Sequence, residues 1–118
     1  MTNPTTTYEG WTNRQTWLAN VWLSNEERLY RRAFERVAWQ LDRSDTPARI
    51  GEGLVYEIMR EMQRLLGRGS SAMYDDFCPE NGEMVIPDIN REELAEHWIA
   101  ELRDLRQHGE VIEPRRIG

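Results

Sequence analysis

Lysine is absent from this 118-residue sequence, and all 15 of its basic residues are arginine. The absence excludes Schiff-base chemistry on a lysine amine. The single cysteine, Cys78, cannot form an intramolecular disulfide, which excludes a disulfide-stapled secreted scaffold. No apolar run approaches the ~20 residues of a transmembrane helix, and residues 1–7 lack the basic and apolar regions of a signal peptide. We therefore expect a soluble cytoplasmic protein without membrane contact.

The residues that are present indicate one polar but foldable domain. Charged residues make up 31% and hydrophobic residues 39% of the chain, and its five tryptophans argue against disorder. With 21 acidic residues the formal net charge is -6, which excludes a strongly basic nucleic-acid coat. We expect a flexible N-terminal arm over 1–11, a single globular helical domain over 12–108 and a C-terminal tail over 109–118.

Apolar residues at helical spacing predict a mainly α protein of about four helices. The third helix is the most apolar and is expected at the centre of the core, although Gly51 and Gly53 weaken its first turns. No long helical period follows it, so we expect a small irregular or β-containing insert over 67–90. Within the insert, a strand is expected over 83–86, and residues 72–78 form either its partner strand or a short helix. The four helices are expected over 12–23, 25–42, 47–66 and 91–107.

Residues that cap helices mark each expected start. Thr12 and Ser24 each begin a capping-box sequence, with Gln or Glu three residues later. Thr46 precedes a proline at the first helical position, and Asn90 precedes the fourth helix. Two capped helices in succession indicate a tight corner, and Gly67 is expected just beyond the third helix.

Acidic residues are concentrated in one segment. Residues 75–96 contain eight carboxylates and one arginine, whereas residues 12–68 contain ten arginines and eight carboxylates. Such an acidic surface fits a basic groove of a partner and can mimic nucleic-acid phosphates there. The alternative is a solvated loop followed by a helix start, where the helix dipole favours acids. The expected partner-binding residues are Asp75, Asp76, Glu80, Glu83, Glu92, Glu93 and Glu96.

A second pattern lies on the helix expected over 25–42, where four arginines and a tryptophan share one face opposite the apolar stripe. Arginines beside an exposed aromatic ring bind phosphates and stacked bases, and they also form protein hot spots. The alternative is an arginine-rich solvent face whose tryptophan is covered by its neighbours. The residues of this candidate nucleic-acid or partner face are Arg28, Arg32, Arg36, Trp39 and Arg43.

Signals for catalysis or metal binding are weak. Cys78 lies in an acid-rich stretch, which disfavours the thiolate. Glu93, His97 and Glu101 share a helix face, but without a second His or a Cys pair a charged surface is the better interpretation. Asp88 begins a run that is similar to a calcium loop, yet Glu93 stands where that loop requires glycine. We expect no catalytic residue, metal or cofactor.

The N-terminal sequence contains a distinctive motif, Gly-Trp-Thr-Asn-x-x-Thr-Trp, whose residues here are Gly10, Trp11, Thr12, Asn13, Thr16 and Trp17, followed by Trp22. This motif, within about 18 of the 118 residues, resembles the opening of a family of small proteins from bacteriophages, plasmids and related mobile elements. The resemblance implies a mobile-element protein in a bacterial cytoplasm and, by analogy, an anti-CRISPR or anti-restriction protein. By their own chemistry, the motif residues cap a helix and pack a helical hairpin.

These patterns support one leading hypothesis and two alternatives. The leading function is a non-enzymatic inhibitor that binds a host defence protein or nuclease complex through its acidic surface and blocks nucleic-acid access. The alternatives are a nucleic-acid-binding accessory protein that uses the arginine face, and a structural or oligomerising protein. Direct nucleic-acid binding is the less favoured partner class, and we expect a monomer or homodimer.

Overall fold

Helices joined by short loops make up the described chain. The computed structural model describes residues 8–78 and 85–108, and this part of the chain contains no strand. The mainly α fold expected from apolar periodicity is confirmed. In chain order the elements are α1 (Arg14–Asn25), α2 (Glu27–Asp42), α3 (Pro47–Gly67), α4 (Ala72–Phe77), the 3-10 helix η2 (Ile86–Asp88) and α5 (Arg91–Gln107).

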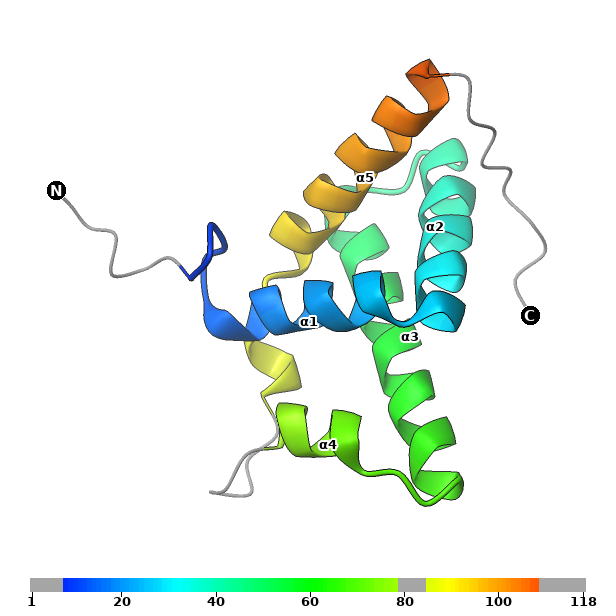
Figure 1. Ribbon diagram of the computed structural model, residues 1–118. Coiled ribbons are helices and arrows are strands. Elements are labelled where there is room, and N and C mark those ends of the chain that lie inside the picture. The colour runs from blue at the N-terminus through cyan, green and yellow to red at the C-terminus, as the bar shows by residue number, and fades with distance from the viewer. Residues whose placement is uncertain (1–7, 79–84, 109–118) are drawn as a thin grey trace, which may run out of the picture.

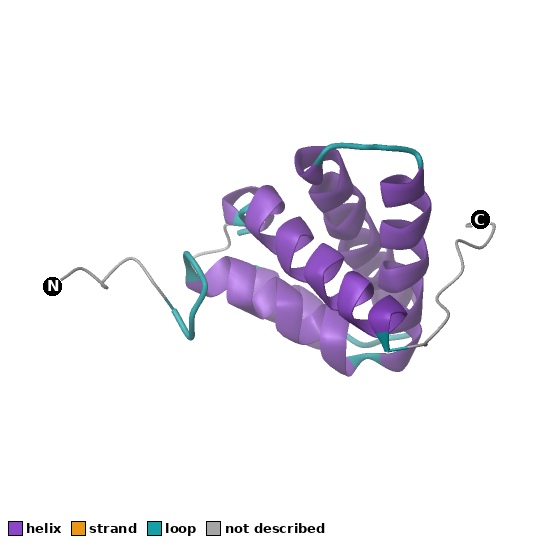
Figure 2. Cartoon of the chain, turned by 90° about the horizontal axis from the view of Figure 1, so that it is seen from above, coloured by secondary structure: helices purple, strands orange, loops and turns teal. Residues whose placement is uncertain are grey.

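Helix α3 is the element around which the others pack. Its contacts with α5 and α2 are the most extensive, α1 crosses in front of it, and α4 lies below α1 (Figure 1). The view from above shows α1 along one side of the other long helices (Figure 2). Ile50, Leu54 and Ile58 of α3 are fully buried, as expected for the most apolar helix.

The cap of α1 lies one residue later than expected. The side-chain oxygen of Asn13 accepts a hydrogen bond from the backbone N–H of Thr16 at 2.8 Å, so Asn13 is the cap and Thr12 is not. Asparagine caps at least as well as threonine. The backbone N–H of Thr12 instead donates to the carboxylate of Glu93 at 3.1 Å.

The corner between α1 and α2 also differs from the expectation. Helix α1 continues to Asn25, and Glu26 takes an extended conformation without a side-chain cap on α2, so the expected cap at Ser24 is wrong. The N–H of Glu26 donates to the carbonyl oxygen of Trp22, and this backbone hydrogen bond closes the end of α1. A tight corner between the two helices is confirmed.

The two later caps agree with the sequence. Thr46 accepts a hydrogen bond from the N–H of Arg49, with Pro47 in the first turn, and Asn90 accepts from the N–H of Glu93. The end of α3 differs slightly, because Gly67 is its last residue and the positive φ of 87° belongs to Gly69.

The segment between α3 and α5 contains helical turns. Of the two alternatives for residues 72–78, the structure has the short helix, α4. The strand expected over 83–86 is wrong at its described end, because Val85 lies in a loop and Ile86 begins η2. Pro87 follows at a position that suits a helix start and cannot donate to a strand ladder. The rest of that strand lies in 79–84, outside the described residues.

Gly51 allows α3 and α5 to approach closely. A Cβ atom at this position would lie 2.2 Å from the carbonyl oxygen of Arg91, the first residue of α5. At Gly53 a Cβ atom would instead meet the side chains of Gln40 and Arg36. The two glycines that weaken the helix therefore serve the packing of α3 against its neighbours.

We expect Gly51→Ala to lower the free energy of unfolding by about 1–3 kcal/mol, although alanine favours helix, because the α5 backbone must move. Gly67→Ala is the control, since nothing lies within 4 Å of its added Cβ. Urea denaturation followed by circular dichroism measures both variants. Equal stability of the two would contradict the close contact.

Candidate functional site

The arginine face expected on the second helix is directed largely toward α3. Glu57 of α3 is 1% exposed and lies against this face. Arg32 donates from Nε to Oε1 of Glu57 at 2.9 Å, and Arg36 donates from Nε to Oε2 at 2.8 Å. Both carboxylate oxygens of Glu57 are therefore held by α2.

Glu61, one turn further along α3 and 4% exposed, holds a second pair of arginines. Arg64 donates from Nη2 to Oε2 of Glu61 at 2.6 Å, and this bonding raises the pKa of Arg64 above its ordinary value. Arg28 approaches Oε1 at 3.8 Å. The arginine–glutamate seam, as we call it, consists of Arg28, Arg32, Arg36, Glu57, Arg60, Glu61 and Arg64.

Burial of the two glutamates is tolerable because each is paired with guanidinium groups. Breaking a buried ion pair costs about 3–5 kcal/mol. The seam contains five arginines and two glutamates, so it keeps a surplus of three positive charges. Sequence reasoning overlooked Glu57 and Glu61, although their spacing of four residues within an apolar helix was a usable signal.

Exposed aromatic rings adjoin the seam. Trp39 is 39% exposed, which confirms that it lies outside the core, and Cζ of Arg43 lies 4.6 Å from its ring centre. Tyr56 of α3 is 52% exposed, with Cζ of Arg36 and Arg60 at 5.3 and 5.8 Å from its ring centre. The expected face is thus divided between a buried charge network and an exposed arginine–aromatic surface.

The acidic residues expected to form one surface lie in two places. Two of them are on α4 and three are on the first turns of α5, and these helices contact α1 from opposite sides in Figure 1. Glu80 and Glu83 lie outside the described residues. The described members are Asp75, Asp76, Glu92, Glu93 and Glu96.

Two of these carboxylates serve the fold. Asp76 accepts a hydrogen bond from Nε1 of Trp22 at 2.9 Å, which attaches α4 to α1. Glu93 accepts from the backbone N–H of Thr12 at 3.1 Å, which attaches the start of α1 to α5. The acidic residues left for a partner are Asp75, Glu92 and Glu96, which are exposed.

Polar residues of the N-terminal motif join α1 to the start of α5. Thr16 is fully buried, and its hydroxyl donates to Oδ1 of Asn13 at 2.6 Å and accepts from the N–H of Asn90 at 2.8 Å. Nδ2 of Asn13 donates to the carbonyl oxygen of Asp88 at 2.9 Å. These polar residues of the motif therefore stabilise the fold.

Residues 8–11, which were expected within the N-terminal arm, form a tight turn. Tyr8 and Trp11 exchange two backbone hydrogen bonds, and the two residues between them have φ angles of 51° and 87°. The ring of Tyr8 lies 5.0 Å from that of Trp17, and the ring of Trp11 lies 4.9 Å from that of His97. The turn therefore packs on α1 and α5.

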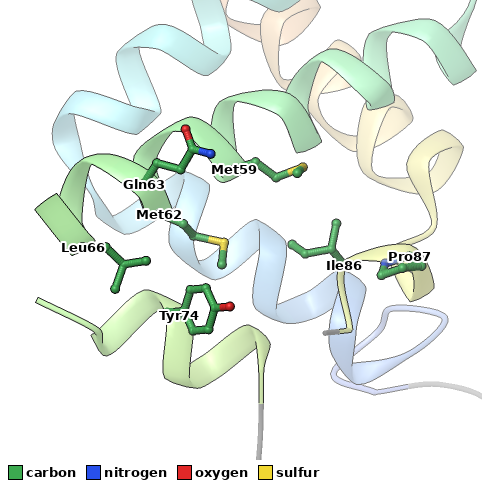
Figure 3. A pocket seen from close by; sticks show the side chains of 7 residues that line it. All are labelled: Met59, Met62, Gln63, Leu66, Tyr74, Ile86 and Pro87. Atoms are coloured by element: carbon green, nitrogen blue, oxygen red, sulfur yellow. The ribbon is translucent and has the colours of Figure 1, made fainter. Parts of the chain in front are cut away.

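An apolar groove of about 280 Å³ lies between α3, α4 and η2 (Figure 3). Met59 and Leu66 belong to the third helix, which was expected at the centre of the core, yet they are 46% and 45% exposed. Among the described residues, α4 is the short helix that covers this end of α3, and its six residues span only about 9 Å. The groove is lined by Met59, Met62, Gln63, Leu66, Tyr74, Ile86 and Pro87.

Among the described residues, no three His, Cys, Asp or Glu side chains gather as metal ligands. The helices of this same part of the chain are each too short or too polar to cross a bilayer. His97, which shares a helix face with Glu93 and Glu101, packs against Trp11.

The chain belongs to DUF7249, a protein family of unknown function, whose sequence profile matches residues 4–97. The match includes the N-terminal motif, the seam and the groove, and it ends within α5. No curated protein matches the chain, and no solved structure matches it.

We expect Thr16→Val to lower the free energy of unfolding by about 1–3 kcal/mol, because the N–H of Asn90 and the oxygen of Asn13 lose their partner. Thr12→Val is the matched control, since the hydrogen bond of Thr12 comes from its backbone. Thermal and urea denaturation measure both. A Thr16→Val protein as stable as the control would show that the motif does not hold the fold.

Proposed function

We propose that this DUF7249 protein is a non-enzymatic binding protein that captures a segment of a protein partner in the groove between α3, α4 and η2. The supporting observation is that Met59 and Leu66 remain 46% and 45% exposed beside an apolar hollow of about 280 Å³. Contiguous exposed apolar surface marks interaction sites, and methionine side chains adapt to varied apolar partners. A partner therefore supplies the apolar side chains that the described part of the chain does not place there.

The charges near the groove favour a basic partner segment. Exposed Asp75 and Asp88 each follow a groove-lining residue in the chain. Arg60 and Arg64 also follow lining residues, but their guanidinium groups lie near the seam glutamates, about 160–200° around α3 from Met59. The one guanidinium beside the groove among the described contacts is that of Arg91, which donates to the carbonyl oxygens of Ile86 and Pro87 and is paired with Glu52 at 3.4 Å. We expect the partner segment to carry apolar anchors flanked by Arg or Lys.

The N-terminal motif suggests the class of partner that the groove binds. Its resemblance to mobile-element proteins favours a host defence protein or nuclease complex in the bacterial cytoplasm as the partner, inhibited by stoichiometric binding that blocks nucleic-acid access. Exposed Glu92 and Glu96, which form no ion pair within the described residues, extend the negative field toward such a target.

Capture from a nuclease-treated bacterial lysate tests the proposal. We expect the wild-type chain to retain a protein partner and the double variant Met59→Gln/Leu66→Gln to bind it at least tenfold more weakly, because the apolar anchors of the partner then face polar side chains. Tyr30→Gln is the control, since Tyr30 is 41% exposed and lies on α2 away from the groove. Circular dichroism establishes that each variant is folded.

Association rates measured with the purified partner then test the role of the two aspartates beside the groove. Asp75→Asn/Asp88→Asn is expected to slow association and weaken its salt dependence. A partner held equally by the wild-type chain and the groove variant would exclude the groove as its site. Failure of the wild-type chain to hold any protein would contradict the proposed function.

A further inference from the structure

We propose that the surface of α2 and α3 over the arginine–glutamate seam binds single-stranded nucleic acid. This surface begins beside the groove, because Tyr56 and Arg60 lie about 60° and 100° around α3 from Met59. It extends to the far side of the helix, where Glu57 and Glu61 lie about 160–200° from Met59. The inference does not rest on the proposed protein partner.

The seam presents positive charge to solvent. Its carboxylates are 1% and 4% exposed, whereas the side chains of Arg28 and Arg60 are 60% and 46% exposed. Glu35 lies on the same face of α2, and Glu26 acts on Arg64, so these two carboxylates lower the local positive charge. The five seam arginines and Arg43, set against four glutamates, leave a local surplus of two positive charges in a chain with a net charge of -6.

Guanidinium donors on this surface remain open to a ligand. The contact of Arg28 with Glu61 is 3.8 Å long, beyond hydrogen-bond length, and Arg60 is 4.0 Å from Glu57. Arginine binds phosphate through paired N–H donors without losing its charge. Arg28 and Arg60 are therefore the residues of the seam best placed to contact a phosphate backbone.

Two exposed rings supply the second part of the recognition. Trp39 and Tyr56 are 39% and 52% exposed, and guanidinium groups lie against both. Arg36 lies 5.3 Å from the Tyr56 ring centre and precedes Trp39 by three residues on α2. Unpaired bases stack on such rings, whereas the bases of a duplex are already stacked on each other. Exposed rings beside phosphate-binding guanidinium groups therefore favour a single strand over a duplex or an acidic protein.

Fluorescence anisotropy of a labelled oligothymidylate, titrated with the full chain over a range of salt concentrations, tests the inference. The logarithm of the affinity should fall linearly with the logarithm of the salt concentration. Arg28→Gln/Arg60→Gln should reduce this slope by about 0.7 for each phosphate that the variant no longer neutralises. Trp39→Ala should weaken binding about five- to 150-fold.

Matched variants show whether binding occurs at this surface. Arg103→Gln removes an exposed charge from α5 and should leave affinity and slope unchanged. Met59→Gln/Leu66→Gln should bind the oligonucleotide as the wild-type chain does, so failure of the groove proposal is recognisable separately. Circular dichroism establishes that the variants are folded.

Four results would overturn the inference. The first is no binding by the wild-type chain at low salt, and the second is equal weakening by Arg28→Gln/Arg60→Gln and Arg103→Gln. The third is equal affinity for a duplex of the same length with no effect of Trp39→Ala. The fourth is displacement by polyglutamate at the same concentration as by unlabelled oligonucleotide, which would indicate an acidic protein ligand.

Discussion

Burial of Glu57 and Glu61 is the constraint on which the rest of the structure depends. A carboxylate that is 1% exposed needs partners, and α2 supplies them through Arg32 and Arg36 at 2.9 and 2.8 Å. The absence of a side chain at Gly53 leaves room for Arg36, because a Cβ there would lie 2.6 Å from its Cδ. These requirements fix α2 against α3, and the two helices together hold the others, because α5 packs mainly on α3 and α1 packs mainly on α2.

The two candidate surfaces adjoin around the same helix, α3. One side of α3 carries paired glutamates under a layer of arginines, and the other carries the exposed methionine and leucine of the groove. The acidic surplus of the chain is divided between α4 and α5, where Asp76 and Glu93 also hold α1 in place. The total charge over residues 12–68 is therefore nearly neutral although the glutamates of the seam are buried and several of its arginines are exposed.

Local features of the fold could be predicted from the sequence, and features that depend on a second element could not. Apolar periodicity predicted the long helices. The residue types at the expected helix starts predicted the caps Thr46 and Asn90. Thr12 and Asn13 are adjacent capping residues, so the local pattern could not choose between them. The arginines of α2 were interpreted as a candidate binding face, or else a solvent face, because their carboxylate partners lie on another helix, α3. Among the described residues, the exposure of Met59 reflects the short length of α4, which no pattern on α3 reveals.

A double-mutant cycle between Arg36 and Glu57 tests the central role of the buried carboxylates most directly. The free energy of unfolding is measured for Arg36→Met, Glu57→Met and the double variant, with the exposed Arg31–Glu27 pair, 68% and 86% exposed, as the reference. We expect a coupling of at least about 1.5 kcal/mol for the buried pair and less than about 1 kcal/mol for the exposed pair. Equal couplings, or a Glu57→Met protein as stable as the wild-type chain, would contradict this role of the buried carboxylates.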